Sequence, residues 1–314
     1  MKCRKCSDKA VINMRQHKLA LCQEHFLDWL PSQVQRFIEK YKMFDHQDRI
    51  LVAVSGGKDS LSLWDILWRL DYQVDGLYIG LGIDGEISYS DQSHNLAESF
   101  ASERGLHLHV INIPDSYGVS IPELAQQTTR GMNKPCAVCG MTKRHIMNRI
   151  ARDEGYNVLA TGHNLDDEAA ALFGNTLNWI PGYLVRQWPV LEAHHPGLAR
   201  KVKPLCRIYE REMAAYAVLR GIEYVYDECP HALGSKTIYY KELLNQLEMD
   251  QPGAKLSFYL SFLQAKENGL FAPQADPGFE RLHECPSCGQ PTSNEGACAF
   301  CRMIDRLPIK SQLP

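Results

Sequence analysis

The segment with the clearest chemical signature is Ser55–Ser60, which has the sequence Ser-Gly-Gly-Lys-Asp-Ser. The apolar run Ile50–Val54 precedes it and is typical of a buried parallel strand, while residues 61–67 have the pattern of an amphipathic helix. Glycines permit a positive φ and close approach of the backbone, and a helix N-terminus carries a partial positive charge. With the ammonium group of Lys58 added, this strand–turn–helix layout predicts a binding site for an anion such as phosphate.

The spacing of this segment excludes a Walker A loop, because the pattern Gly-x-x-x-x-Gly-Lys-Ser/Thr is missing. The segment instead resembles the PP-loop of ATP pyrophosphatases, which split ATP into AMP and pyrophosphate. The alternative is an ordinary glycine-rich turn. We favour the PP-loop, because the whole motif stands between a predicted strand and a predicted helix.

Eleven cysteines are the second chemical feature of the chain. In a reducing compartment, cysteines are more often metal ligands or catalytic groups than disulfides. Zinc takes four ligands in a tetrahedron, and two pairs of C-x2-C type supply them from two short loops. The spacing predicts two structural zinc sites, although His25 alone would also suit the surface. The predicted ligands are Cys3, Cys6, Cys22 and His25 for the first site, and Cys285, Cys288, Cys298 and Cys301 for the second.

Three further cysteines are predicted to share the crevice with the PP-loop. Cys136 and Cys139 precede a basic helix predicted over residues 140–154, where the helix N-terminus and nearby cations would lower the pKa of a thiol. Cys229 follows Tyr224–Tyr226, which we predict to be a short last strand. The remaining cysteine, Cys206, is interpreted as a small buried hydrophobic residue.

An acidic motif, Gly-His-Asn-Leu-Asp-Asp-Glu at residues 162–168, opens another predicted helix. Carboxylates in a first helical turn stabilise the helix dipole, which is the structural interpretation. Hard cations also prefer carboxylate oxygens, so the same residues suit Mg²⁺ or nucleotide phosphates. Because the motif follows a predicted strand over residues 157–161, we expect at least one aspartate to be functional.

Strands and helices alternate after the PP-loop, which predicts an α/β fold with a doubly wound parallel sheet. Ligands of such sheets bind beyond the carboxyl ends of the strands. Further strands are predicted at residues 74–79 and 106–113, a short hairpin at 11–14 and 19–21, and helices at 26–44, 90–104, from 209, after Cys229 and at 252–270.

The chain of 314 residues is expected to hold an N-terminal zinc finger at 1–30, a central domain at 31–275 and a C-terminal zinc ribbon at 276–314. Residues 273–277 are expected to be a linker. The net charge of −3 means that any surface for nucleic acid must be local. The start of the chain has no signal-peptide pattern, and no apolar run reaches the length of a membrane span, so we expect a cytoplasmic protein without membrane contact.

The order of these motifs resembles that of the TtuA-type tRNA 2-thiolation enzymes, in the TtcA/TtuA family of PP-loop ATP pyrophosphatases. The resemblance covers nearly the whole chain and is clearest in residues 19–29, 49–60, 160–170 and 298–303. It implies a HUP-like central domain flanked by the two zinc modules. One departure is the loop at residues 83–88, which is longer than the family's loop after the second strand.

The resemblance implies an ATP-dependent tRNA sulfurtransferase. ATP would adenylate the 2-carbonyl oxygen of a T-loop uridine or ribothymidine, and AMP would leave as sulfur enters. Cys136, Cys139 and Cys229 would hold a [4Fe-4S] cluster whose open iron binds the attacking sulfide. The sulfur would come from the C-terminal thiocarboxylate of a ubiquitin-like carrier protein, and the enzyme would be a homodimer that uses Mg²⁺ and two Zn²⁺.

The resemblance also assigns individual residues. The ATP-binding residues would be Ala53, Ser55, Gly56, Gly57, Lys58, Asp59, Ser60, Ile79, Lys143 and Gly162. The catalytic residues would be Asp59, Lys143 and Asp167, together with Cys136, Cys139 and Cys229.

Three alternatives remain open from the sequence. The sister branch thiolates the anticodon wobble uridine by similar chemistry. A cluster-free thiolase would use Cys136 or Cys139 with Cys229 as a persulfide and disulfide pair. A non-catalytic tRNA-binding zinc protein would keep only a relic of the nucleotide site, but the presence of Lys58, Asp59 and Asp167 argues against it.

Overall fold

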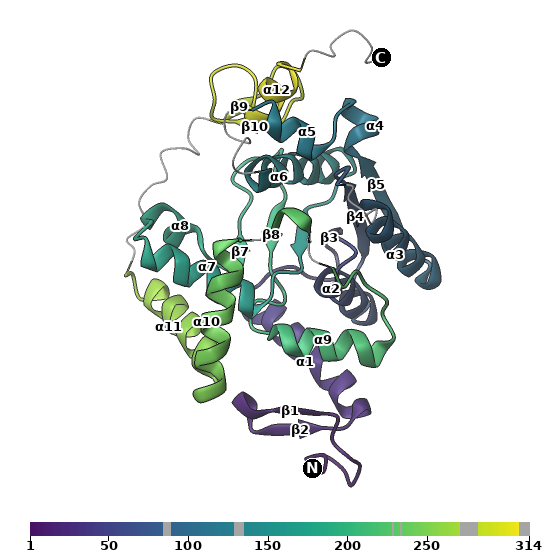
Figure 1. The fold of residues 1–314 in the computed structure, drawn as a ribbon, viewed down its shortest axis with the longest axis vertical. Helices are drawn as coiled ribbons and strands as arrows, with labels where there is room; N and C mark the ends of the chain where they lie inside the picture. Colours follow the sequence, from purple (N-terminus) through teal and green to yellow (C-terminus); the bar gives the residue numbers. More distant parts are fainter. Residues whose placement is uncertain (84–88, 129–134, 228, 233, 271–281, 308–314) are drawn as a thin grey trace.

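The computed structural model describes residues 1–83, 89–128, 135–227, 229–232, 234–270 and 282–307 (Figure 1). The central sheet of this described part has six strands in the order β5-β4-β3-β6-β8-β7. All neighbouring pairs are parallel except β7 with β8, so the predicted doubly wound α/β fold is confirmed. The strands are β3 Ile50–Val54, β4 Val74–Gly80, β5 Leu108–Asn112, β6 Val158–Thr161, β7 Val190–Leu191 and β8 Arg200–Val202.

Alternate residues of the strands face opposite layers of helices. Ile50 and Val52 pack into a core with α1 (Gln23–Lys40), α2 (Lys58–Arg69), α3 (Tyr89–Arg104) and α9 (Glu210–Arg220). Leu51 and Leu77 pack on the other face with α5 (Ile121–Gln126) and α6 (Pro135–Asp153). Such alternation is expected, because successive side chains of a strand point to opposite faces of the sheet. The remaining long helices are α7 Leu165–Leu177, α10 Lys236–Asp250 and α11 Ala254–Glu267, with short α4 Ile113–Tyr117 and α8 Pro181–Arg186.

Two predictions about the elements near the cysteines were wrong. Helix α6 begins at Pro135 instead of residue 140, so Cys136 and Cys139 lie in its first two turns. Residues 224–226 form no strand, because the backbone N–H of Val225 donates to the carbonyl of Gly56 at 2.9 Å in the PP-loop. Val225 is buried here, whereas Tyr226 is 79% exposed, so the apolar and aromatic composition of this segment does not mark a buried strand. Strands β7 and β8, which the sequence did not reveal, complete the sheet.

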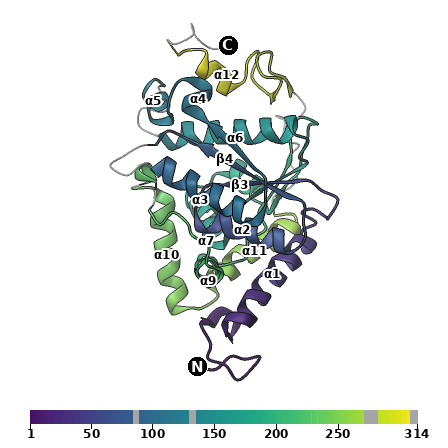
Figure 2. The same ribbon diagram turned by 90° about the vertical axis from the view of Figure 1, so that its right-hand side faces the viewer.

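The two cysteine-rich modules lie at opposite ends of the molecule (Figures 1 and 2). The N-terminal hairpin pairs β1 (Ile12–Met14) with β2 (Leu19–Leu21), as predicted. The C-terminal module contains β9 (His283–Glu284), β10 (Pro291–Thr292) and α12 (Ala299–Ile304). The predicted linker at 273–277 and most of the loop at 83–88 lie outside the described residues.

Each module packs against helices of the central domain. The side-chain amide of Gln16 donates to Glu212 of α9 at 2.8 Å. At the other end, the Phe300 ring stacks on His145 of α6 with centroids 4.0 Å apart, and Gln290 donates to the His145 carbonyl at 2.8 Å. Among the described residues, every helix is too short or too polar to span a lipid bilayer.

A fully buried carboxylate, Asp65 of α2, joins three helices. It accepts hydrogen bonds from Tyr216 at 2.7 Å and Arg220 at 2.9 Å, both on α9, and from Arg104 of α3 at 3.1 Å. At the start of the same two helices, Lys58 lies 2.7 Å from Glu210. Helices α2 and α9 therefore run side by side in the same direction, with both N-termini at the PP-loop.

We expect Asp65→Ala to lower the free energy of unfolding by about 3–5 kcal/mol, because it leaves two partly buried guanidinium groups without their carboxylate. Urea unfolding followed by circular dichroism measures this loss. The matched control is Glu103→Ala, which removes the exposed carboxylate that pairs with Arg104. The control should cost less than about 1 kcal/mol, and an equal loss in both variants would contradict the role of Asp65.

The ionisation of Asp65 should also make the free energy of unfolding depend on pH. Burial alone would raise the pKa of Asp65, but hydrogen bonds from Arg220 and Tyr216 outweigh burial and lower this pKa below its ordinary value. The stabilisation is therefore fully present above the ordinary carboxyl pKa of about 4 and is lost as the pH falls through the lowered value. The stability gap between the wild type and Asp65→Asn should be constant from pH 7 to pH 5 and shrink below pH 4. A gap that stays constant down to pH 3 would contradict this assignment.

Candidate active site

The PP-loop is held in one shape by close contacts. Gly56 has a φ of +73°, and a Cβ placed on it would lie 2.5 Å from the carbonyl oxygen of Ser93, so only glycine fits there. The hydroxyl of Ser60 donates to the Gly57 carbonyl at 3.0 Å and accepts from the Ser55 N–H at 3.1 Å. No described side chain caps the N-terminus of α2. The first N–H groups of this helix are therefore available to an anion.

The end of strand β6 lies directly against this loop. A Cβ on Gly162 would be 2.9 Å from the backbone nitrogen of Ser60. The close approach explains why glycine follows the strand, and it brings the acidic motif at the start of α7 beside the PP-loop. The structure thus brings the predicted residues Ser55–Ser60 and Gly162 together.

Lys58 and Asp59 form an ion pair at 3.1 Å beside the loop, and Lys58 also pairs with Glu210. Burial disfavours the charged ammonium, but Asp59 and Glu210 outweigh it and raise the pKa of Lys58. Burial also raises the pKa of Asp59, although Lys58 opposes this shift. The positive charge of Lys58 is thereby secured at neutral pH.

Asn164 is a residue whose role the sequence did not reveal. It is fully buried at the N-cap of α7, and its side-chain oxygen accepts from the N–H groups of Asp166 at 2.9 Å and Asp167 at 3.2 Å. Its side-chain nitrogen donates to Asp59 at 3.2 Å. The backbone N–H of Asn164 also donates to the Asp167 carboxylate at 3.0 Å. Asn164 therefore donates to both predicted catalytic carboxylates, to Asp59 through its side chain and to Asp167 through its backbone. The spacing of Asn164 and Asp167 is that of a capping box, which was the signal available in the sequence.

The three acidic residues at the start of α7 have different roles. Asp166 is buried and pairs with Lys255 at 2.5 Å, while Glu168 is buried and pairs with Lys203 at 2.8 Å. Both are structural. The side chain of Asp167 is 28% exposed, and it is the aspartate of this motif that remains open to a metal ion or nucleotide.

A second lysine completes the charged cluster. Lys241 of α10 lies 2.6 Å from Asp167 and 3.2 Å from Glu210. Burial opposes the charge of Lys241, but both carboxylates outweigh it and raise the pKa of Lys241. Lys241 and Glu210 were not predicted, because the pairs that define them join segments far apart in the sequence.

A cavity of about 100 Å³ lies at the carboxyl ends of β3 and β4. Its lining includes four of the predicted ATP-binding residues, Ala53, Ser55, Ile79 and Lys143. Lys143 reaches it from α6, on the face of the sheet opposite to α2. The cavity therefore joins the PP-loop to the helix that carries the two cysteines.

The three predicted cluster cysteines come from two segments. Cys136 and Cys139 belong to α6, and Cys229 directly precedes the short helix Pro230–Ala232. Cys136 lies 3.6 Å from the carbonyl of His231, in the short helix that follows Cys229, and Cys139 and Cys229 pack against the same apolar core. Burial raises the pKa of the Cys139 thiol, with Lys143 opposing, so the predicted lowering of its pKa was wrong. Cys206 is fully buried, and burial raises its pKa to about 12, as suits a structural residue.

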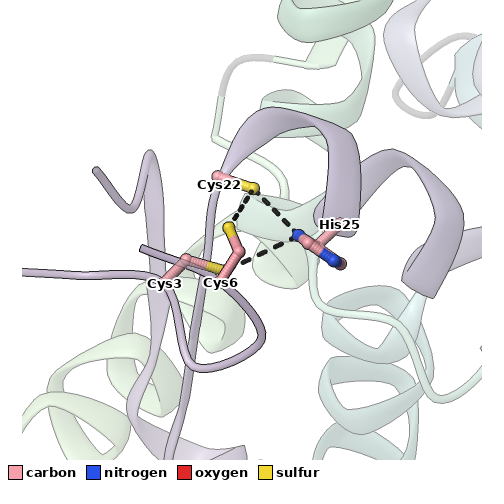
Figure 3. A group of neighbouring side chains, drawn as sticks. All are labelled: Cys3, Cys6, Cys22 and His25. Atoms are coloured by element: carbon pink, nitrogen blue, oxygen red, sulfur yellow. Dashed lines mark hydrogen bonds between the residues drawn. The ribbon is translucent and has the colours of Figure 1, made fainter. Parts of the chain in front are cut away.

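The four predicted zinc ligands of the N-terminal module converge on one point (Figure 3). The sulfur of Cys22 lies 3.7 Å from that of Cys6 and 3.1 Å from Nδ1 of His25. A tetrahedral zinc with Zn–S bonds of about 2.3 Å spaces two sulfurs about 3.8 Å apart. Burial opposes ionisation of Cys3, but backbone hydrogen bonds from Cys22 and Lys5 lower its pKa to about 6. This donor set fits a zinc ion.

The C-terminal group has the same geometry. Cys288 and Cys298 have sulfurs 3.9 Å apart, and the N–H of Cys298 donates to the Cys285 sulfur at 3.2 Å. All four ligand atoms, including that of Cys301, lie within 4.8 Å of one another. In the part of the chain that the structure describes, Cys136, Cys139 and Cys229 form no group as tight as these two.

Family models match the N-terminal module and the central domain, and named relatives match nearly the whole chain. Residues 2–27 match a family model described as 2-thiouridine synthetase TtuA, N-terminal LIM domain, and residues 30–232 match a PP-loop domain. A Thermus thermophilus tRNA-5-methyluridine(54) 2-sulfurtransferase is 50% identical over 97% of this chain and 91% of that protein. The Thermotoga maritima protein of the same name is 40% identical over 96% of both chains.

A solved structure supports the same relationship at lower identity. The U34-tRNA thiolase NcsA from Methanococcus maripaludis, determined with its [4Fe-4S] cluster, superposes with a TM-score of 0.78. The match covers 100% of this chain and 99% of that one, at 25% identity. Because half of its residues are identical to a named relative along almost its whole length, this chain belongs to the TtuA-type family of tRNA-5-methyluridine(54) 2-sulfurtransferases.

Proposed function

We propose that this protein is an ATP-dependent tRNA sulfurtransferase that converts uridine or ribothymidine at position 54 of the T-loop into its 2-thio form. The observation that carries the proposal is the position of Lys143. It lines the same cavity as Ser55 of the PP-loop and lies one helical turn after Cys139. A single helix thus connects a site for nucleotide with a site for sulfur.

The nucleotide half of the site suits activation of a carbonyl oxygen. The N–H groups of α2 and the ammonium of Lys58 would bind pyrophosphate, and Asp59 and Asp167 would hold Mg²⁺. The uridine O2 attacks the α-phosphorus and pyrophosphate leaves. Sulfur then attacks C2, and the oxygen departs with AMP. Lys143 and Mg²⁺ would offset the charge that develops on the phosphate.

The proposed ATP-binding set is the one predicted from the sequence. It comprises Ala53, Ser55, Gly56, Gly57, Lys58, Asp59, Ser60, Ile79, Lys143 and Gly162.

The sulfur half of the site consists of Cys136, Cys139 and Cys229, which we propose as ligands of a [4Fe-4S] cluster. The donor set fits, because Cys136 and Cys229 are both near enough to influence the pKa of Cys139, while among the described residues the three thiols form no group tight enough for a single ion. A cluster of four irons needs that wider spacing. With three protein thiolates, the cluster would supply one iron open to a sulfide ligand. The half-buried position of Cys139 and Cys229 would limit access of water to this place.

We also propose a structural zinc ion in each terminal module, because each set of four donors is closed and leaves no position for substrate. The proposed sulfur donor, a ubiquitin-like carrier with a C-terminal thiocarboxylate, and the proposed homodimer rest on the family resemblance alone.

The sister activity on the wobble uridine is the nearest alternative. The relatives named for position 54 are 50% and 40% identical, whereas the U34 thiolase is 25% identical, which favours the T-loop. A relic nucleotide site is disfavoured, because Lys58, Asp59 and Asp167 remain joined through Asn164 and Glu210.

We expect Cys229→Ala, purified without oxygen, to lose its iron and its thiolation activity while it keeps its zinc. From the ligand sets, the wild type should hold about four irons and about two zinc ions per chain. Elemental analysis measures both metals, and visible absorption follows the iron–sulfur cluster. The matched control is Cys206→Ala, which removes a buried thiol outside the site and should keep both. A colourless, iron-free wild type that still thiolates tRNA would refute the cluster and support the persulfide alternative.

The target position is tested in the host. Mass spectrometry of tRNA from a deletion strain should show loss of the 2-thio group at position 54, with wobble uridines unchanged, because the family relationship is to the position-54 enzymes. Complementation with Asp59→Ala should not restore thiolation. Loss at the wobble position with an intact T-loop would contradict the proposed target.

A further inference from the structure

The carboxylate of Glu210 lies between two lysines that come from different helices. One of its oxygens is 2.7 Å from Lys58 in the PP-loop, and the other is 3.2 Å from Lys241 in α10. Each lysine also has a second carboxylate partner, Asp59 for Lys58 and Asp167 for Lys241. Two ammonium groups are thus held on the two oxygens of one anion, beside the N-terminus of α2.

The backbone of Glu210 is held in place, whereas its side chain has room to change conformation. Its backbone N–H donates to Asp166 at 2.8 Å, and Asp166 is fixed in a buried ion pair with Lys255. The side chain is 33% exposed and is held only by the two lysines in the described residues. It can therefore turn toward solvent while the helix stays in place.

In the observed arrangement, the net charge of this cluster of lysines and carboxylates disfavours the binding of pyrophosphate. Two ammonium groups face three carboxylates, so the formal sum is negative. With Glu210 turned away and a divalent cation on Asp59 and Asp167, the same groups sum to a positive charge that suits a polyphosphate. A phosphate group also presents several oxygens to several cations, as the carboxylate of Glu210 does here, but with more charge.

We propose that Lys241 is a second pyrophosphate-binding cation, and that Glu210 occupies the place of the leaving phosphates until nucleotide displaces it. The inference rests on the proposed cleavage of ATP at the PP-loop and adds to it a binding residue from α10. Glu210 holds both lysines in position, so they need little reorganisation when the phosphates arrive. The displacement lowers the apparent affinity for pyrophosphate, because the anion competes with an internal one.

Substitutions of Lys241 and of Glu210 are therefore expected to change the Kd for pyrophosphate in opposite directions. Binding of inorganic pyrophosphate to the full-length, anaerobically purified protein is measured by calorimetry with excess Mg²⁺ and no tRNA. Lys241→Gln should raise the Kd about tenfold, and Lys241→Arg should stay within about threefold of the wild type, since it keeps the charge. Glu210→Gln should lower the Kd about threefold or more, since it removes the competing charge. The matched control is Lys236→Gln, an exposed lysine of the same helix, which should change nothing.

Tighter binding in Glu210→Gln is a result that a merely structural role would not produce. A Kd for Lys241→Gln within twofold of the wild type, or weaker binding in Glu210→Gln, would overturn the inference, as would a wild type that binds no pyrophosphate. If circular dichroism shows that Lys241→Gln does not fold, the Kd values of Glu210→Gln and Lys241→Arg test the inference in its place. Thiolation of tRNA is assayed separately, so a wild type that binds pyrophosphate without thiolating tRNA would contradict the proposed function alone.

Discussion

The buried carboxylate of Asp65 is the interaction on which the geometry of the site depends. It fixes α9 beside α2 through Tyr216 and Arg220, so that the two helices start at the same edge of the sheet. The N-terminus of α9 then lies beside that of α2, but the backbone N–H of Glu210 is already bonded to Asp166. The partial positive charge of α2 and the charge of Lys58 remain for an anion. The parallel arrangement also carries Glu210 to the PP-loop, although 152 positions separate it from Lys58. A buried carboxylate that lost one partner would be costly, which makes this packing strongly specified.

Both cysteine-rich modules stabilise helices that carry site residues. The N-terminal module contacts Glu212, two residues after Glu210 in α9. The C-terminal module packs on α6 through the Phe300 and His145 rings. Each module is too small to form a core of its own, so closed metal sites suit them as rigid supports. Their position at opposite ends of the molecule matches the two halves of the site (Figure 1). One supports the phosphate side, and the other supports the helix of Cys139 and Lys143.

Local patterns predicted most of the fold and the residues that act within one segment. The PP-loop, the strand periodicity and the C-x2-C pairs each carry their signal within a few residues, and all appear in the structure as expected. The sequence did not predict the role of residues whose contacts lie far away in the chain. Residues 224–226 have the composition of a strand, but their backbone partner is the PP-loop. Glu210 and Lys241 look like ordinary charges on exposed helices, since only the tertiary fold brings them to Asp167 and Lys58.

The need for a cation from α10 follows from the charges that the reaction brings together. A helix N-terminus provides only about half a positive charge, and Lys58 adds one. Pyrophosphate and the two aspartates that we propose as Mg²⁺ ligands together carry far more negative charge, which the metal ion would balance only in part. A further lysine on α2 itself would point along the same helix and could not reach the opposite side of the phosphates. Lys241 on α10 is bonded to the oxygen of Glu210 that Lys58 does not contact, and from there it would reach that side of the phosphates.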